Sequence, residues 1–591
     1  MAMNNPDIEA DGGFYGQFRH KVFRSGIVMI DYMRDQGYDI SVRREEDREQ
    51  LDAVKNTLNI KLYGHFLQAE LYLSFTDEYL IDIDNAVRRK WIHHDGKNLK
   101  TGSNFGHPAK MPWIATIRQD DQSYEYRITL SFVDTLSIMG YMSLDQVSKT
   151  VGVEMPYKDI ISSDEKGRMD QVYLEDPDES GLYRFDRYAL GDLTMYRILE
   201  KYRDLMKEMW GSLSVADYWK DGYIPRLTIG GSIRDLMQAL LFKMMEIQPD
   251  DKSRQKQLMG ILSKCGADHF RSQTDTTIYL AGFSTGGRCR NVRPTDSNAY
   301  GALCDVDVQS CYGEGSRAQP YIVGVPVVLF FNRKGAGVIK PTLRQCLDQF
   351  GDELVPLHWY ATVSMDSLSP LEFPNTFFVS RFDIGKKKKR YWYQDDDHGR
   401  GEVKIFTHWI ENTVINHDAI QYILHVCSPE QRDELLDRLY VQVLVMYPAS
   451  ERCKTPEEFW ALHDNHAGSS GCQLEISKGN TRTVLYEEQC HAWYAETMGE
   501  LCTNKLLEQR LTFGKEAPEA ELRKLIINGI PGVISSQFME VSNLLVANNI
   551  TASVRALMWY MESAFQGYQV ITDGMVIDLN NVVYPVEDTI Q

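Results

Sequence analysis

The last part of the chain carries two apolar patterns that predict a helix and a hairpin. Residues 542–565 have the apolar spacing of a long helix, and the runs YQVIT and MVIDL follow with Asp573-Gly574 between them. A DG dipeptide between two apolar runs predicts a tight turn. We therefore expect a long helix and then a β-hairpin with Asp573 at its tip. Taken alone, this pattern indicates a turn and nothing more.

An earlier apolar segment places a second carboxylate in a strand. The run ALCDVDVQSCYG, which begins at Ala302, predicts a short buried strand that contains Asp307 and ends in a turn. Two carboxylates on adjacent strands of one sheet can bind two divalent ions roughly 3.5–4 Å apart, an arrangement that supports phosphoryl-group transfer. Asp307 and Asp573 are therefore our first candidates for a metal site.

A helical pattern between these two segments offers groups that suit a triphosphate. In ELRKLIINGIPGVISS, Lys524 and Asn528 are one helical turn apart and project from the same face. Lysine supplies a point charge for phosphate, and asparagine supplies a neutral donor. We expect this helix to end at Gly529 and Pro531-Gly532.

These segments, in this order, resemble the polymerase motifs of family B DNA polymerases. The family's first motif is D-x-x-S-L-Y-P, and the chain matches it at Asp307, Ser310 and Tyr312. The third motif is Y-x-D-T-D-S, and here Asp573 retains its second acid while Ile571 stands where the first acid is expected.

The family's second motif, K-x-x-x-N-S-x-Y-G, is similar to the segment around Lys524. The matching residues are Lys524, Asn528, Gly529 and Gly532, and Pro531 replaces the aromatic residue. The helical run ITASVRALMWYMESAF leads into the third motif as it does in the family. The resemblance is closest to the protein-primed, plasmid and phage branch.

The resemblance implies a role for each matched residue. Asp307 and Asp573 are expected to bind two Mg²⁺ (or Mn²⁺) ions, and Tyr312 is expected to be the steric gate that packs under the deoxyribose and excludes a 2′-hydroxyl. The nucleotide-binding residues are expected to be Val308, Ser310, Cys311, Tyr312, Lys524 and Asn528, with Lys505 and Arg510 of the preceding helix as further phosphate contacts. The alternative for Lys505 and Arg510 is that they are solvated helix charges.

The N-terminal part partly matches the 3′–5′ exonuclease that precedes the polymerase in this family. Asp7 and Glu9 in DIEA resemble its first motif, and Glu70 occupies the place of the second. Tyr188 and Asp192 match the third motif, Y-x-x-x-D, at the head of a helix that we expect to run to about residue 209. We expect an RNase H-like nuclease fold of the DEDD type. An amphipathic helix with Glu70 exposed remains an alternative.

Two further segments are candidates for contact with nucleic acid. FSTGGR is similar to the Y-x-G-G loop that contacts template in protein-primed relatives, so Gly286, Gly287 and Arg288 are expected at the DNA. The basic run Lys386–Arg390 is either the tip of a solvated hairpin or a nucleic-acid contact.

The expected fold class is a multidomain α+β protein with an exonuclease, a right-hand palm and fingers. The expected divisions are 1–230 exonuclease, 231–300 connection with the template loop, 301–330 first part of the palm, 331–480 insertion, 481–550 fingers, and 551–591 second part of the palm. Only residues 574–591 follow Asp573, so we expect no thumb in this chain and a partner protein that supplies it. The alternatives are that the protein is a fragment or that the fold serves another task.

Composition narrows the remaining possibilities. The formal charge of −19 means that any affinity for phosphate depends on local clusters of Lys and Arg. The ten cysteines form no CxxC pair, which argues against a disulfide framework or structural zinc. No apolar run is long enough to span a membrane, and the N-terminus is not a secretory signal. We expect a cytoplasmic protein from a bacterial, plasmid or phage replication system.

The expected function is template-directed polymerisation of dNTPs on a DNA primer-template, with a possible proofreading exonuclease. One alternative is an enzyme that retains only the nuclease. Another is a catalytically silent polymerase-fold subunit that binds nucleic acid as a scaffold. A reverse transcriptase would end in an aromatic-x-D-D hairpin, which VITDG does not provide.

Overall fold

The chain forms two compact units in the computed structural model. One comprises Met1–Ser232 with Phe513–Leu522, and the other comprises Ile233–Thr512 with Arg523–Gln591. Mixed helix and sheet in more than one unit agrees with the expected class at this coarse level. The described residues are 28–35, 37–65, 77–88, 93–94, 99–100, 109–119, 122–134, 142–179, 181, 183–192, 195–220, 222–226, 228–265, 287–291, 302–308, 311–331, 341–365, 379–383, 402–406, 413–466, 490–514, 517–536 and 539–581.

The first unit is built on a four-stranded sheet of order β1-β5-β6-β2. β1 and β6 both pair antiparallel with β5, and β2 pairs parallel with β6. Its strands and flanking helices are α3 (Val28–Asp35), β1 (Asp39–Arg44), α4 (Arg48–Ala53), β2 (Thr57–Gly64), α6 (Asp77–Arg88), β5 (Ala109–Gln119) and β6 (Gln122–Asp134). Their apolar faces close one core around Trp113, which is fully buried.

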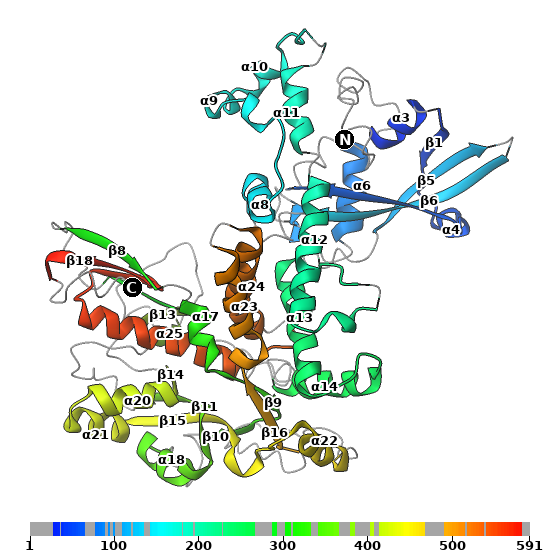
Figure 1. Ribbon diagram of the computed structural model, residues 1–591. Coiled ribbons are helices and arrows are strands. Elements are labelled where there is room, and N and C mark those ends of the chain that lie inside the picture. Colours follow the sequence, from blue (N-terminus) through cyan, green and yellow to red (C-terminus); the bar gives the residue numbers. More distant parts are fainter. Residues whose placement is uncertain are drawn as a thin grey trace. The chain divides into compact units, whose positions relative to one another are not determined.

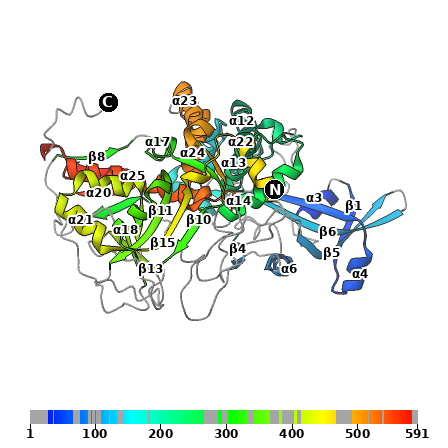
Figure 2. The same ribbon diagram turned by 90° about the horizontal axis from the view of Figure 1, so that it is seen from below.

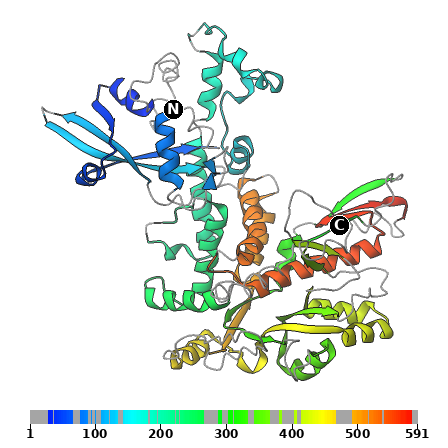
Figure 3. The ribbon, with the colours of Figure 1, turned by 180° about the vertical axis from the view of Figure 1, so that it is seen from behind.

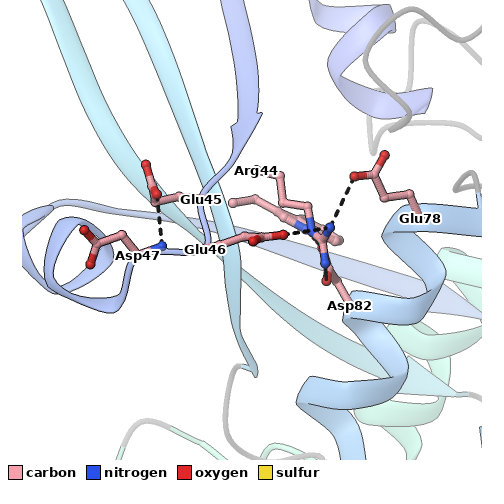
Figure 4. Close-up of polar contacts among 7 residues, drawn as sticks. Arg44, Glu45, Glu46, Asp47, Glu78 and Asp82 are labelled. Atoms are coloured by element: carbon pink, nitrogen blue, oxygen red, sulfur yellow. Dashed lines mark hydrogen bonds and ion pairs between the residues drawn. The ribbon is translucent and has the colours of Figure 1, made fainter.

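An ion-pair network joins α6 to the edge strand β1 of this sheet (Figure 4). Arg44 donates two hydrogen bonds of 2.9 Å to the buried carboxylate of Asp82, and it lies 3.4–3.5 Å from Glu78 and Glu46. The indole of Trp113 also donates to Asp82, at 2.7 Å. The carboxylate therefore receives donors from two strands.

Helices complete the first unit. They are α8 (Leu144–Val151), α9 (Ser163–Lys166), α10 (Met169–Tyr173), α11 (Arg184–Asp192), α12 (Met195–Ser212) and the first turn of α13 (Ile229–Met244). A capping box of Ser143 and Gln146 starts α8, and Gly152 in the left-handed conformation ends it.

The second unit contains a four-stranded antiparallel sheet of order β10-β15-β11-β14. α18, α20 and α21 accompany it (Figure 2) and share its core. The elements are β10 (Val327–Phe330), α18 (Leu343–Phe350), β11 (Leu354–Met365), β14 (Thr413–Asn416), α20 (His417–Val426), α21 (Pro429–Arg438) and β15 (Leu439–Pro448). Most of them come from residues 331–480, the expected insertion, whose limits remain a prediction.

The long helix α25 (Leu544–Ala564) connects this sheet to a second one, as the pattern of residues 542–565 predicted. Asn543 caps its first turn, and Asn549 on the helix donates a 2.6 Å hydrogen bond to the Leu357 carbonyl of β11. The other half of α25 packs under the sheet β7-β17-β18-β8 (Figure 1). The candidate site lies on this sheet.

The second unit also contains several further elements. They are α14 (Lys252–Cys265), α17 (Cys311–Arg317), β9 (Pro320–Gly324), β12 (Val379–Asp383), β13 (Glu402–Phe406), α22 (Pro456–Asn465), β16 (Trp493–Thr497), α23 (Asn504–Phe513) and α24 (Pro518–Ser535), whose first turn lies in the first unit. β12 and β13 pair antiparallel on either side of the basic run, as a hairpin requires, but Lys386–Arg390 lies outside the described residues.

Two general features can be stated for the described part of the chain. Its cysteines with described side chains are free thiols. In the same residues, we find no helix with the length and apolarity that membrane crossing requires.

Candidate active site

The strand that carries Asp307 presents carboxylates on its open face. In β8 (Leu303–Asp307) exposure alternates, because Cys304 and Val306 pack toward α25 while Asp305 and Asp307 face away from it. The strand is therefore half-buried, not fully buried as its apolar letters predicted. Alternation places both acids on the same side of the sheet.

The hairpin of β17 (Gln569–Thr572) and β18 (Gly574–Asp578) brings Asp573 beside Asp307. Ile571 pairs with Gly574, and Gly574 pairs with Asp307 on β8. The carbonyl of Asp573 accepts a 2.9 Å hydrogen bond from the Val308 amide. The expected adjacency of the two acids is thus present.

The turn itself differs by one residue from the expectation. Its two central residues are Thr572 and Asp573, because Gly574 is already a strand residue. Thr572 has φ +55°, a left-handed conformation that a β-branched residue rarely adopts. Its hydroxyl oxygen lies 2.7 Å from Asp573 Oδ1 and 2.8 Å from the Ile571 carbonyl, so its single proton can be donated to either oxygen, and donation to Asp573 would orient that carboxylate.

The charges around Asp307 oppose its ionisation. Desolvation raises the pKa of Asp307, and the neighbouring Asp573 and Asp305 raise it further, whereas Lys524 lowers it. Repulsion between carboxylates is what a bound cation relieves. Lys524 is thus one of the charged groups that act on Asp307, and its contact with a triphosphate remains a prediction.

Close packing of three helices brings Lys524 to this position. A Cβ at Gly313 of α17 would lie 3.0 Å from Ile527 Cγ2 on α24 and 3.4 Å from Leu507 Cδ2 on α23. Lys524 and Asn528 are exposed on the same helix, one turn apart. α24 lies beside α23 (Figure 3), where Arg523 donates to Gln509 at 2.9 Å.

α24 continues past the point where the sequence predicted its end. It runs through Gly529 and Pro531 to Ser535, and Ile526, Ile530 and Ile534 are buried along it. Burial of this apolar stripe outweighs the hydrogen bond that proline removes.

Lys505 and Arg510 lie on α23, which follows a π-helical turn at Gly499–Thr503. Lys505 is exposed and Arg510 is partly buried. Asn504, at the start of α23, accepts a 2.8 Å hydrogen bond from Arg317 of α17. The helix is thereby fixed to the segment after Asp307, but contact of Lys505 or Arg510 with phosphate remains a prediction.

The backbone amides of Val308 and Cys311, in the loop after Asp307, already donate hydrogen bonds within the protein. The Val308 amide bonds to Asp573, and the Cys311 amide donates to the Val308 carbonyl at 3.2 Å. The Cys311 side chain is buried against α25, and burial raises the pKa of its thiol to about 11. A triphosphate contact through these two amides would require the loop to rearrange. Ser310 lies outside the described residues.

Arg288 is an internal residue, which differs from its expected role at the template. It lies on β7 (Arg288–Asn291) with its side chain fully buried, and it donates to Glu562 of α25 at 2.7 and 3.2 Å. β7 pairs with β17, so this ion pair joins the sheet to the helix below it. Gly287 precedes β7, and Gly286 lies outside the described residues.

The predicted exonuclease residues are only partly described. Tyr188 and Asp192 share one face at the C-terminal end of α11, not at the head of a longer helix. Lys158 lies 3.9 Å from the centre of the Tyr188 ring and forms an ion pair with Asp192. Asp192 therefore already has a cationic partner. Asp7, Glu9 and Glu70 lie outside the described residues.

The donor set on this sheet suits a divalent cation of the Mg²⁺ type. Carboxylate oxygens are ligands that Mg²⁺ prefers, and Asp307 faces other acids. Within the described residues, no group of three or more His, Cys, Asp or Glu side chains could hold a metal ion. The fit therefore rests on the pair Asp307 and Asp573, with remaining ligands to come from substrate and water.

Sequence reasoning missed four residues around the site. Asp305 could have been found from strand alternation, since it lies two residues before Asp307 on the same face. Arg555 and Glu562 are buried charges two turns apart on the mostly apolar α25. The sequence shows these two charges in an apolar helical pattern, but it does not show which residues they contact. Thr572 carries no sequence signal, because its left-handed conformation depends on the strand register.

Comparisons with known proteins find a distant structural likeness. No family model and no curated protein matches the chain. Phi29 DNA polymerase complexed with primer-template DNA aligns at 10% identity and a TM-score of 0.39, over 90% of this chain and 73% of that chain. The same polymerase in an orthorhombic crystal form aligns at 11% identity and a TM-score of 0.40, over 92% and 75%. A likeness at this level does not assign the chain to a family.

Proposed function

We propose that the chain is a template-directed DNA polymerase that adds deoxynucleotides to a primer end. The observation that carries the proposal is the backbone pairing that makes Asp307 and Asp573 neighbours: Gly574 pairs with Asp307, and the Asp573 carbonyl accepts a hydrogen bond from the Val308 amide. Desolvation and the like charges of Asp573 and Asp305 raise the pKa of Asp307. An arrangement that is unfavourable without a cation is typical of a metal-dependent site.

Each residue of the pair and its surroundings would have a separate role in nucleotidyl transfer. Asp307 and Asp573 would hold divalent ions, which supply activation of the primer hydroxyl and stabilisation of the leaving pyrophosphate. Lys524 would offset the charge of the triphosphate, and Asn528 on the same helical face would donate to it. Tyr312 would lie under the sugar of the incoming nucleotide.

Primer extension tests this proposal. The wild type should extend a DNA primer with dNTPs in Mg²⁺, and Asp307→Asn or Asp573→Asn should lower the rate by about 10³-fold or more, because the lost metal contact is worth several kcal/mol. Asp352→Asn, an exposed acid in the same unit, is the matched control and should extend normally. Equal extension by wild type and Asp307→Asn would show that the assignment is wrong.

A second candidate is a scaffold that binds nucleic acid without catalysis. Ile571 favours it, because this residue is 55% exposed on the hairpin where the resemblance expects an acid. Calorimetry separates the two proposals. A polymerase should bind a dNTP in a Mg²⁺-dependent manner that Asp573→Asn abolishes, whereas a silent scaffold should show no such binding while it still retains DNA.

Exonuclease activity of residues 1–230 remains a separate proposal. Asp192 could hold a metal only after its ion pair with Lys158 opens. Degradation of a labelled single strand that Asp192→Ala abolishes and Asp307→Asn preserves would support it. Degradation that survives Asp192→Ala would contradict it.

A further inference from the structure

Gly287 occupies a position where a side chain has no room. A Cβ at this residue would lie 2.7 Å from the Tyr312 hydroxyl oxygen, 3.0 Å from Thr572 Cα and 3.2 Å from Thr572 Cβ. Optimal carbon contacts are about 3.5–4.0 Å, so an added methyl group would force a neighbour to move. The absence of a side chain at position 287 is therefore required for space.

Residues from three parts of the chain lie near the phenol end of Tyr312. Gly287 stands before β7, Thr572 ends β17, and Arg555 belongs to α25. Arg555 is buried, and burial lowers its pKa to about 10 while the nearby Tyr312 acts in the opposite direction. Burial and the charge of Asp573 raise the pKa of Tyr312, so its hydroxyl stays protonated at neutral pH. We call Gly287, Thr572 and Arg555 the Tyr312 niche.

Among the three nearest atoms that an added methyl group would meet, the Tyr312 hydroxyl is the closest and the only one at the far end of a long side chain. Thr572 is held by its paired strand and by its hydrogen bond to Asp573, and Arg555 lies on the long buried helix. A methyl group at position 287 would therefore displace Tyr312 before it displaced backbone, because the hydroxyl is the far end of a side chain. The position of the ring depends on the absence of a side chain at 287.

We propose that Gly287 is a positioning residue that sets the discrimination between deoxyribonucleoside and ribonucleoside triphosphates. By leaving room for the Tyr312 hydroxyl, it fixes the height of the ring against the sugar of the incoming nucleotide. The inference rests on the proposed polymerase function. Gly287 would then act at the incoming nucleotide, in addition to its expected contact with the template strand.

Single-nucleotide incorporation with matched dNTP and rNTP tests the proposal. The ratio of kcat/KM for dNTP to that for rNTP should fall at least about fivefold in Gly287→Ala, mainly through KM, since the ring contacts the sugar and not the reacting phosphate. Tyr312→Val should lose discrimination more completely. Gly260→Ala, where an added Cβ meets nothing within 4 Å, should leave the ratio unchanged.

A double variant identifies the contact responsible. Tyr312→Phe keeps the ring and removes the oxygen that the new methyl group would meet. It should restore discrimination to Gly287→Ala. If Gly287→Ala does not fold, restored folding in the double variant supports the same contact, as judged by thermal unfolding.

The failures can be told apart. A wild type that incorporates no nucleotide contradicts the proposed function itself. A wild type that discriminates, together with a folded Gly287→Ala whose ratio is unchanged, overturns only the role of Gly287. If Tyr312→Phe rescues neither discrimination nor folding, the methyl group is blocked by Thr572 and the proposal is also overturned.

Discussion

Asp82 in the first unit packs against a sheet and Asp307 in the second lies on one, but the surroundings of the two carboxylates are opposite. Asp82 is 4% exposed and accepts hydrogen bonds from Arg44 and Trp113 (Figure 4). Asp307 is exposed, and its nearest charged groups include Asp573 and Asp305. Asp82 is surrounded by hydrogen-bond donors, whereas Asp307 has other carboxylates as neighbours.

The difference separates a structural acid from a functional one. A buried carboxylate that receives charge-assisted donors stabilises the contacts around it. A carboxylate that is crowded by other acids lowers stability and persists where a ligand balances it. Substitutions at the two kinds of position should therefore change stability in opposite directions.

The largest effect is expected at Glu562, a structural acid directly below the candidate site. Glu562→Gln removes the negative charge that balances the fully buried Arg288 guanidinium. Breaking a buried ion pair from one side typically costs about 3–5 kcal/mol of unfolding free energy. Urea unfolding at neutral pH, followed by tryptophan fluorescence, measures the loss. The control variant, Glu451→Gln at an exposed position, should have an unfolding free energy within about 0.5 kcal/mol of wild type. An equally small change in Glu562→Gln would show that Glu562 is not a structural acid.

A smaller loss is expected at Asp82, and it should be local. Asp82→Asn weakens the bonds from Arg44 and Trp113 by about 2 kcal/mol, so amide hydrogen exchange in β1 and β5 should accelerate roughly tenfold or more. Asp39→Asn in the same sheet is the matched control, because its ion pair with Arg118 is long, 3.7 Å, and exposed. It should change exchange by less than about threefold. Similar exchange rates in the two variants would show that the buried contacts of Asp82 contribute nothing to the local stability of β1 and β5.

The local parts of the site were predictable from the sequence. The hairpin that carries Asp573, the strand that carries Asp307 and the helix at 542–565 follow from periodicity and turn chemistry over short windows. The two acids meet because β8 and β18 pair, which the motif order indicated.

The remaining features depend on contacts that are distant in sequence. Arg288 is internal because its partner, Glu562, arrives from α25 far along the chain. Pro531 stays within α24 because that helix buries an apolar stripe. The turn centres on Thr572 because Gly574 is committed to pairing with β8 as well as with β17. No local pattern contains these pairings.

Thr572 tests the functional side of the comparison. Thr572→Gly relieves a left-handed conformation that costs about 1–3 kcal/mol in a residue of this type, and greater chain entropy offsets about 0.5–1 kcal/mol of the gain. Thermal stability should therefore be equal or higher. Primer extension should fall about tenfold, because Asp573 loses the hydroxyl that orients it. Thr572→Ser keeps the hydroxyl and should keep the activity; if it is as slow as the glycine variant, orientation by this bond is not the cause.

The smallest effect on stability is expected at Asp305. Its sign should be opposite to that at Asp82, because substitution of Asp305 should raise the free energy of unfolding. Its charge helps raise the pKa of Asp307, so the folded chain holds the Asp307 proton more tightly than the unfolded chain does. A raised carboxyl pKa lowers folding stability once the pH passes from the unfolded pKa through the folded one, and it has no effect when the group is protonated in both states.

Asp305→Asn removes one source of this repulsion, so at neutral pH and without divalent cations the variant should be more stable than wild type. The gain should be less than about 0.5 kcal/mol, because the charges are solvent-exposed. Its size should shrink as the pH is lowered through the acid range and also in 1 M salt, which reduces the screening length to about 3 Å. Differential scanning calorimetry across pH measures this pattern. A variant that is less stable than wild type at neutral pH would place Asp305 with Asp82 among the structural acids, since removing a donor-bound carboxylate lowers stability and removing a repelled one raises it.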